Sequence, residues 1–417
     1  MAPSGRTVRA DSHRWSPARF RRNRVAGAGR VTCLLWTAQR QRRSPGGLSI
    51  PLTEYSLNTP ESFHASRPFQ RYRHHPRPGG NMKEGDTAAP GPSANGNGLT
   101  LNRADFEAAY RNVAPYAYRT PMLTSRSLSE ECGLDVRLKA ELFQRGGSYK
   151  LRGPLNKIAR LSEEECARGV ICSSAGNHSQ GVALAARQYG VRAVVVMAKN
   201  ATRSKIAATE GYGARVVLHG NIWDEANEKA LELVEAEGLT YIHPFDDPEL
   251  IAGQGTLGLE IMDQLPETEL LIVPIGGGGL ISGVSMAAKS VNPEVRIIGV
   301  ESSGAPGMKR SVEAGASIVL DEVDCIIDGL RVKKVGNHTC SVVSRFVDEI
   351  VTLPDAQIFD AMLWLMTRAK VVVEGAAAAP VGALLQGLVD APAGTSTVCV
   401  LSGGNLDVEG MRGRSWN

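Results

Sequence analysis

Short apolar runs of strand length alternate with helical segments along most of the chain, and this alternation most constrains its fold. The runs are apolar throughout, so each strand is expected to be buried on both faces, as in parallel sheets covered by helices. The sequence therefore predicts an α/β fold of two lobes with parallel-rich sheets. Strands are expected at 169–173, 193–197, 215–218, 270–275 and 295–300, and helices at 180–189, 203–212, 223–238, 257–265 and 280–291.

The N-terminal extension, residues 1–99, differs from the rest in composition. Residues 1–80 hold 15 of the 47 basic residues and three of the 43 acidic ones, so they carry a charge of +12 and leave 32 basic and 40 acidic residues, or −8, for the remainder. Three interpretations stay open: a targeting peptide, a disordered tail, or upstream sequence with Met82 as the true start. We predict a catalytic domain over 100–411, with a small lobe at about 169–246.

Charge and cysteine content exclude several classes of function. An acidic catalytic domain does not favour a nucleic-acid partner, and without an apolar run of 18 or more residues no membrane crossing is expected. The seven cysteines form no CxxC pair, which argues against a zinc site. Scattered thiols suit a reducing compartment, so we predict a cytoplasmic protein, or an organellar one if residues 1–81 are a genuine transit peptide.

Four consecutive glycines, Gly276, Gly277, Gly278 and Gly279, follow an apolar strand and precede a helix that begins near Leu280. Residues without Cβ let backbone N–H groups converge on phosphate oxygens, and the helix adds the positive end of its dipole. The alternative is a merely flexible turn. Neither the GxGxxG spacing nor the Lys-Ser/Thr pair of a P-loop is present, so one small phosphate fits better than a nucleotide.

Lys150 occupies an unusual position for a lysine. The turn 146–148, Gly-Gly-Ser, delivers it to the start of a predicted helix. There the positive end of the helix dipole disfavours an ammonium group and helps to free the amine for reaction with an aldehyde. The alternative is an ordinary solvated surface lysine. The phosphate site predicted elsewhere in the chain favours the first interpretation, because an aldehyde cofactor that carries a phosphate would need both.

Small polar residues follow two other predicted strands. Ser174, Ala175, Gly176, Asn177 and His178 lie between a strand and a helix, where backbone N–H groups, hydroxyls and an amide can receive a carboxylate. A serine cap and an asparagine turn are an equally good interpretation of this segment by itself, and His178 alone would be structural.

A second strand end lies near the C-terminus, where Ser402 follows the apolar run 396–401. Strand ends are where α/β sheets hold ligands. A hydroxyl that stabilises the turn is the alternative for this serine.

Together these four segments resemble the threonine dehydratase and serine racemase family of pyridoxal-phosphate enzymes, and within it the catabolic threonine dehydratases. The likeness extends from about Thr100 to Asp407, and includes the segments 241–248 (YIHPFDDP), 253–256 (GQGT) and 371–376 (VVVEGA). The resemblance implies the tryptophan-synthase-β-like fold, known as fold type II, and pyridoxal 5′-phosphate as cofactor.

The resemblance also implies a role for each site residue. Lys150 would hold the cofactor through its amine, with Tyr149 against the ring, Asn177 at the ring hydroxyl and Ser402 at the pyridine nitrogen. The phosphate would bind to the segment from Gly276 to Leu280. Glu374 would lie near the site. The residues implied to receive the substrate carboxylate are Ser174, Ala175, Gly176 and His178.

The implied reaction is elimination of water from L-threonine or L-serine, followed by release of a 2-oxo acid and ammonia, with the Lys150 amine removing the α-proton. Related racemases carry a serine where this chain has Ala175, and an alanine cannot carry a proton, so a dehydratase is favoured over a racemase. A ligand-binding relative without activity is a third interpretation. The motifs leave threonine, serine, 3-hydroxyaspartate and phenylserine open as substrates.

Two further expectations concern metals and assembly. Some relatives bind a divalent metal, and Glu301 lies where their acidic ligand would be, but Gly307 stands in place of a second carboxylate. We therefore expect no metal, with Glu301 as a weak candidate. The resemblance implies a homodimer or homotetramer whose only other partner is a small amino-acid substrate.

Overall fold

The computed structural model describes residues 98–406, which form a six-stranded and a four-stranded sheet with helices packed against both. Residues 1–97 of the predicted extension 1–99, including Met82, lie outside the described residues, as does the predicted end of the catalytic domain at 407–411. Among residues 98–406, no helix combines the length and the apolar character that crossing a membrane requires.

The larger sheet is parallel except at one edge. Its strands lie in the order β1, β2, β10, β7, β8, β9, and the one antiparallel pair is β1 with β2. Strand β10, from the end of the chain, therefore lies between two strands from much earlier positions, and the carboxyl ends of β2, β10 and β7 meet at one edge of the sheet. The strands are β1 Met122–Thr124, β2 Asp135–Ala140, β7 Leu270–Pro274, β8 Arg296–Ser302, β9 Glu349–Leu353 and β10 Ser396–Leu401.

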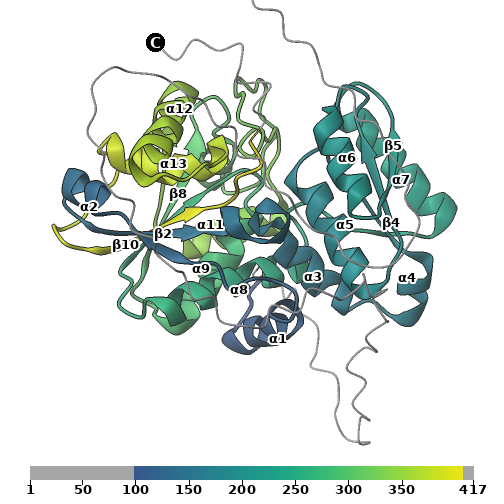
Figure 1. Ribbon diagram of the computed structural model, residues 1–417, viewed down its shortest axis with the longest axis horizontal. Helices are drawn as coiled ribbons and strands as arrows, with labels where there is room; N and C mark the ends of the chain where they lie inside the picture. The colour runs from purple at the N-terminus through teal and green to yellow at the C-terminus, as the bar shows by residue number, and fades with distance from the viewer. Residues whose placement is uncertain (1–97, 407–417) are drawn as a thin grey trace, which may run out of the picture. The chain divides into compact units, whose positions relative to one another are not determined.

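Helices cover both faces of this sheet (Figure 1). Ile272 of β7 packs with residues of α12 and α13, whereas its neighbours Leu271 and Val273 pack on the opposite face with α8 and α9. All three side chains are fully buried, which explains why the strand is apolar at every position. The predicted α/β class with parallel-rich sheets covered by helices is confirmed. The four helices are α8 Pro248–Gln264, α9 Gly279–Val291, α12 Asp355–Trp364 and α13 Gly375–Leu385.

The smaller sheet is wholly parallel, in the order β5, β4, β3, β6. Val195 of β4 packs with residues of α3 and α5, and its neighbours Val194 and Val196 pack with α7 on the other face. The core of this sheet also includes Val113, which lies earlier in the chain than the small lobe predicted from the sequence. The elements are β3 Val170–Ser173, β4 Ala193–Met197, β5 Arg215–Leu218, β6 Thr240–Tyr241, α3 Arg152–Ala159, α4 Glu163–Arg168, α5 Asn177–Tyr189, α6 Arg203–Gly211 and α7 Trp223–Glu237.

Local signals in the sequence explain several helix ends. Asn102 and Asp105 form a capping box at the start of α1, and Ser162 with Glu165 does the same for α4. Helix α7 ends at Gly238 in the left-handed conformation. The remaining elements are α1 Arg103–Val113, α2 Arg126–Cys132, α10 Gly307–Ala314, α11 Asn337–Phe346, the 3₁₀ turns η1 Glu141–Phe143, η2 Arg145–Gly147 and η3 Tyr149–Leu151, and the π-helical turn η4 Leu365–Ala369.

Two predicted helices begin earlier than expected. Helix α5 begins at Asn177 and not at residue 180, because its first turn consists of small polar residues typical of a loop. Helix α8 begins at Pro248, where Asp247 accepts a hydrogen bond from the N–H of Leu250, and not at residue 257. The glycines of α8 interrupt the apolar periodicity from which helices are predicted. They are needed because α8 and α9 pack closely: a Cβ on Gly283 of α9 would lie 2.5 Å from the Gly255 nitrogen of α8.

Candidate active site

The turn that carries Lys150 is joined to the end of the central strand β10. Ser148 and Gly403 form an isolated antiparallel bridge, and the N–H of Tyr149 donates to the Ser402 carbonyl oxygen at 3.0 Å. These bonds explain why the lysine lies at the carboxyl edge of the larger sheet. The structure thus brings Tyr149, Lys150 and Ser402 together.

The Lys150 amine reaches toward the glycine run through one intervening turn. Its Nζ donates to the Pro244 carbonyl oxygen at 2.9 Å. The next residue, Phe245, lies directly against the glycines, since a Cβ on Gly277 would come within 2.2 Å of its ring and one on Gly279 within 2.9 Å of its backbone. Lys150 and the glycine run therefore adjoin the same short segment, although about 125 positions separate them in the sequence.

The glycine run presents backbone donors that have no acceptor in the protein. Helix α9 begins at Gly279, and its N-cap residue, Gly278, is in the left-handed conformation and offers no side-chain cap. Among residues 98–406, no group accepts a hydrogen bond from the N–H of any residue from Gly276 to Ile281. The first N–H groups of any helix lack an internal partner, and here the preceding loop extends the series. Such converging donors bind an anion.

Burial makes the Lys150 amine a better nucleophile than an ordinary lysine. The surrounding protein excludes water from the ammonium form and lowers the pKa of Lys150 from 10.5 to about 8, although the nearby Glu374 acts in the opposite direction. The same burial raises the pKa of Glu374. Since desolvation opposes charge on both groups, a neutral amine and a neutral carboxyl are both more accessible here than in water.

Asn177 is fixed between the two lobes by other site residues. Its Nδ2 donates to both oxygens of Glu374 at 2.7 and 2.8 Å, and its Oδ1 accepts from Asn405 Nδ2 at 2.8 Å. Asn405 also donates to the carbonyl oxygen of Gly146, in the turn before Lys150. This chain of bonds places the first residue of α5 next to the lysine turn.

The start of α5 forms a second group of unpaired donors. Ser174 accepts from the N–H of Gly176 through its hydroxyl, which makes a local turn, and Ala175 packs at the edge of the small-lobe core. Within the described part of the chain, the N–H groups of Asn177, His178 and Ser179 have no acceptor. This helix end can receive an anion through its backbone.

The His178 side chain is directed away from this role. Its Nε2 lies 2.9 Å from the Ile242 carbonyl oxygen, to which it donates, so its Nδ1 carries a lone pair. Burial, together with the nearby Lys150, lowers the pKa of His178 to about 3. A neutral imidazole whose only N–H is already used cannot donate to a carboxylate, so His178 can offer an anion only its backbone N–H.

Comparison with known proteins agrees with this geometry. The family model described as pyridoxal-phosphate dependent enzyme matches residues 113–403. The chain belongs to this family.

Named members of the pyridoxal-phosphate family resemble the chain closely. L-threonine ammonia-lyase of Thermotoga maritima is 49% identical over 304 residues, which cover 73% of this chain and 75% of the relative. L-threonine dehydratase catabolic TdcB of Escherichia coli K12 is 44% identical over 305 residues, 73% of this chain and 93% of the relative. The structure of maize serine racemase matches with a TM-score of 0.72 at 36% identity, over 75% of this chain and 96% of the racemase.

The residues present fit pyridoxal phosphate as the family's cofactor. The unpaired N–H groups from Gly276 to Ile281 suit its phosphate, and the Lys150 amine, with its lowered pKa, suits its aldehyde. These two features adjoin the same segment, Pro244 and Phe245, as one molecule that carries both groups requires.

Two contacts of the site were not predicted from the sequence. The Pro244 carbonyl oxygen holds the Lys150 amine, and Asn405 connects Asn177 to Gly146. A backbone carbonyl leaves no residue-type signal, so the first contact could not be found in this way. The second had a signal, because Asn405 ends the same small polar turn that contains Ser402.

Glu301, the candidate metal ligand, has a different set of partners. Its carboxylate accepts the N–H groups of Met308 and Lys309 in the first turn of α10 at 2.7 and 2.9 Å. Burial nevertheless raises the pKa of Glu301 to about 7. Among residues 98–406, no group of three or more His, Cys, Asp or Glu side chains is arranged to hold a metal. The observed contacts make Glu301 a helix cap.

Proposed function

We propose that this protein is a threonine/serine dehydratase that removes water and then ammonia from L-threonine or L-serine and leaves a 2-oxo acid. The observation that supports this most is the position of the Lys150 amine, bonded to Pro244 beside the glycine run. The likeness to L-threonine ammonia-lyase and catabolic threonine dehydratase adds the substrate class.

The cofactor would be held by the residues that the family resemblance implies. In this proposal the N–H groups of the run from Gly276 to Leu280 bind the phosphate, Asn177 and Ser402 contact the ring, and Tyr149 lies against it. Pyridoxal phosphate, when bound, withdraws electrons from the α-carbon of an attached amino acid, so that the α-proton becomes acidic and the β-hydroxyl can leave.

The protein groups then have separate tasks. The Lys150 amine accepts the α-proton, which its lowered pKa of about 8 permits near neutral pH because about a tenth of the amine is unprotonated there. The substrate carboxylate binds at the start of α5, to the Ser174–Gly176 turn, Ala175 included, and to the N–H groups of Asn177 and His178. Glu374, which is partly buried and accepts from Asn177 Nδ2 at 2.7 Å, orients that amide.

A racemase is the second candidate, favoured by the likeness to maize serine racemase. Racemisation needs a proton donor on each side of the α-carbon, and the alanine at position 175 carries none. L-serine should therefore yield pyruvate without D-serine. A chiral assay that found D-serine formed at a rate comparable with pyruvate would overturn the preference for a dehydratase.

Turnover of purified protein tests the proposal directly. The protein is loaded with pyridoxal phosphate and incubated with L-threonine, and 2-oxobutanoate and ammonia are measured. We expect the two products in equal amounts. Lys150→Ala, treated identically, is the control for the cofactor's own reactivity in solution. The same assay is repeated with L-serine, 3-hydroxyaspartate and phenylserine, because the sequence motifs do not show which of these substrates is preferred. Absence of a 2-oxo acid from every member would leave a ligand-binding relative without activity as the better explanation.

Assembly and location are proposed on the resemblance and on composition. We propose a homodimer or homotetramer in the cytoplasm, with no nucleic-acid or membrane partner. Light scattering on a gel-filtered sample would test the assembly, and a monomer at micromolar concentration would contradict it. Imaging of the chain with and without residues 1–81 would test the location, since a transit peptide would redirect the longer form to an organelle.

A further inference from the structure

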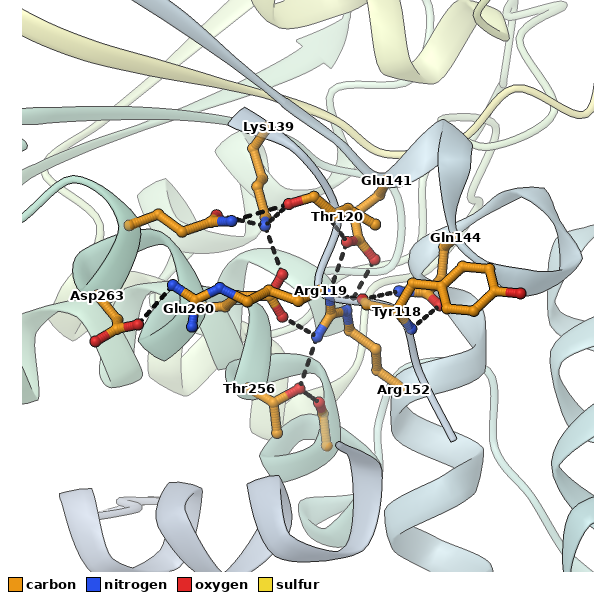
Figure 2. Close-up of polar contacts among 12 residues, drawn as sticks. Tyr118, Arg119, Thr120, Lys139, Glu141, Gln144, Arg152, Thr256, Glu260 and Asp263 are labelled. Carbon is orange, nitrogen blue, oxygen red and sulfur yellow. Dashed lines mark hydrogen bonds and ion pairs between the residues drawn. The ribbon is translucent and has the colours of Figure 1, made fainter. Parts of the chain in front are cut away.

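Four charged side chains are buried together and contact one another, as Figure 2 shows. They are Lys139 of β2, Glu141 of η1, Arg152 of α3 and Glu260 of α8, each at most 3% exposed. We call these four residues the Arg152 network. Two cations and two carboxylates make it neutral as a whole. It lies outside the site described above and has no part in the proposed chemistry.

Arg152 has an acceptor for each of its N–H groups. Its Nε and Nη2 donate to the two oxygens of Glu141 at 2.8 and 2.7 Å, and its Nη1 pairs with Glu260 at 2.9 Å. The remaining two donors reach Thr256 Oγ1 at 3.4 Å and the Tyr118 carbonyl oxygen at 3.5 Å. The fork of a guanidinium group allows these five bonds in one orientation, so the side chain is fixed.

Lys139 completes the network in the same manner. Its Nζ donates to Glu260 at 2.6 Å, to Gln264 at 2.7 Å and to the Thr120 carbonyl oxygen at 2.8 Å, so all three of its donors are used. The hydroxyl of Thr120 donates to Glu141 at 2.6 Å. Cations and carboxylates therefore alternate, from Lys139 through Glu260 and Arg152 to Glu141, without an unpaired charge.

The network joins the lysine turn to three other elements. Arg152 follows Lys150 by two residues, and its backbone N–H donates to the Tyr149 carbonyl oxygen of that turn. Residues two apart on a helical turn point to roughly opposite sides. Lys150 accordingly points to Pro244 and the site, while Arg152 points to β2, η1 and α8. Fixing Arg152 fixes the direction in which the amine leaves the turn.

Stability alone is a poor reason for such a cluster. Removing four charges from water is costly, and apolar residues of the same volume serve a protein core equally well or better. A fully paired network does give one geometry and no alternatives. Together with the position of Arg152 next to the lysine turn, this indicates a role in alignment.

We propose that Arg152, held by Glu141 and Glu260, is a positioning residue that aligns the Lys150 amine for attack on the cofactor aldehyde. The inference rests on the proposed function, since it assigns Lys150 the role given above. The titratable groups that face the amine are Tyr149 on its own turn, His178 on α5, His243 before α8 and Glu374 before α13. None of them belongs to the network, so altering the network leaves these neighbours in place.

The decisive variant is the double substitution Arg152→Met with Glu141→Met. It removes one cation and one carboxylate together, and the Lys139–Glu260 pair stays intact, so no charge is left unpaired. Arg152→Met alone would leave the buried Glu141 carboxylate without its cation, and this variant is expected to fold poorly for that reason. Leu138→Ala is the matched control, because Leu138 is buried on the same strand as Lys139 but belongs to the core on the other face of the sheet.

The measurement is incorporation of pyridoxal phosphate into the apo-protein across a pH series. Borohydride traps the product, and mass spectrometry quantifies the pyridoxyl group on the peptide that contains Lys150. A looser turn admits water, so the double variant should react with a midpoint about one pH unit higher than the wild type. Turnover should fall about 100-fold, which is the usual effect of a misplacement of about 1 Å. Leu138→Ala should lower the melting temperature and leave the midpoint unchanged.

The outcomes separate the two proposals. If the wild type takes up no pyridoxyl group at Lys150, the proposed function fails, and this inference fails with it. If the wild type is labelled and a folded double variant has the same midpoint and turnover, the network is a structural element only and this inference alone is overturned. If the double variant does not fold, Arg152→Lys, which keeps the charge but not the fork, provides the same comparison.

Discussion

The two sides of the lysine turn differ in how they treat polar groups. On the side of the site, the N–H groups from Gly276 to Ile281 and at the start of α5 have no acceptor among residues 98–406. On the opposite side, every donor of Lys139 and Arg152 is paired. Unpaired buried donors are costly, so they persist where a ligand will satisfy them. In our proposal, the paired side is a scaffold and the unpaired side is a receptor that binds cofactor and substrate.

The largest effect is expected from the residue that faces the receptor side. Lys150→Ala should lower turnover of L-threonine by about 10³-fold or more, because both the base and the attachment point are removed. The melting temperature of the apo-protein should change little, since within residues 98–406 the amine donates one hydrogen bond, to Pro244. Steady-state kinetics and thermal unfolding measure the two quantities. Lys229→Ala, a surface lysine paired with Glu232, should keep full activity.

Substitutions in the Arg152 network, on the scaffold side, should lower the stability of the protein. Lys139→Met leaves Arg152 as the one cation between the two buried carboxylates Glu141 and Glu260, so one negative charge in the network is no longer balanced. This should lower the free energy of unfolding by about 3–5 kcal/mol. Denaturant unfolding measures the change. Arg119→Ala removes an exposed ion pair with Asp263, which lies on α8 like Glu260. This change should lower the free energy of unfolding by at most about 1 kcal/mol. Equal losses from the two variants would contradict the distinction between scaffold and surface.

A side chain added to the glycine run should weaken the binding of pyridoxal phosphate. In Gly277→Ala the new Cβ would lie 2.2 Å from the Phe245 ring, so Phe245 and the adjoining Pro244 must move. Overpacking of about 1–3 kcal/mol predicts a cofactor Kd raised about tenfold. Equilibrium titration of the apo-protein with pyridoxal phosphate provides the Kd. Gly211→Ala is the matched control, because a Cβ there meets nothing within 4 Å. An unchanged Kd in Gly277→Ala would remove the glycine run from the receptor.

The smallest effect is expected in the pH dependence of the reaction between pyridoxal phosphate and Lys150. The neutral amine is the reactive form, and the pKa of Lys150 is lowered from 10.5 to about 8. The rate of pyridoxyl incorporation should therefore rise about tenfold per pH unit below that value and level off above it. Stopped-flow absorbance across the series measures it. A rise that continued to pH 10 would mean that the amine is as well hydrated as a surface lysine.

Much of the fold and of the site could be predicted because their signals are local. Apolar runs such as that of β7 identify strands buried on both faces, and the glycine run after this strand predicts an anion site from its position alone. The early starts of α5 and α8 were missed because their first turns contain glycines and small polar residues, whose helical conformation is stabilised by packing and not by propensity.

By itself, the sequence determined which chemical groups the protein possesses: a lysine that precedes a helix, a run of four glycines after a strand, and an alanine without a proton donor at position 175. Only the tertiary structure decided which groups meet. The Lys150 amine bonds to Pro244 across 94 positions, Lys139 to Glu260 across 121, and Asn405 to Asn177 across 228. No local pattern encodes such contacts, because they join strand ends of the two sheets, or a strand and the helix packed on it, which only folding brings together.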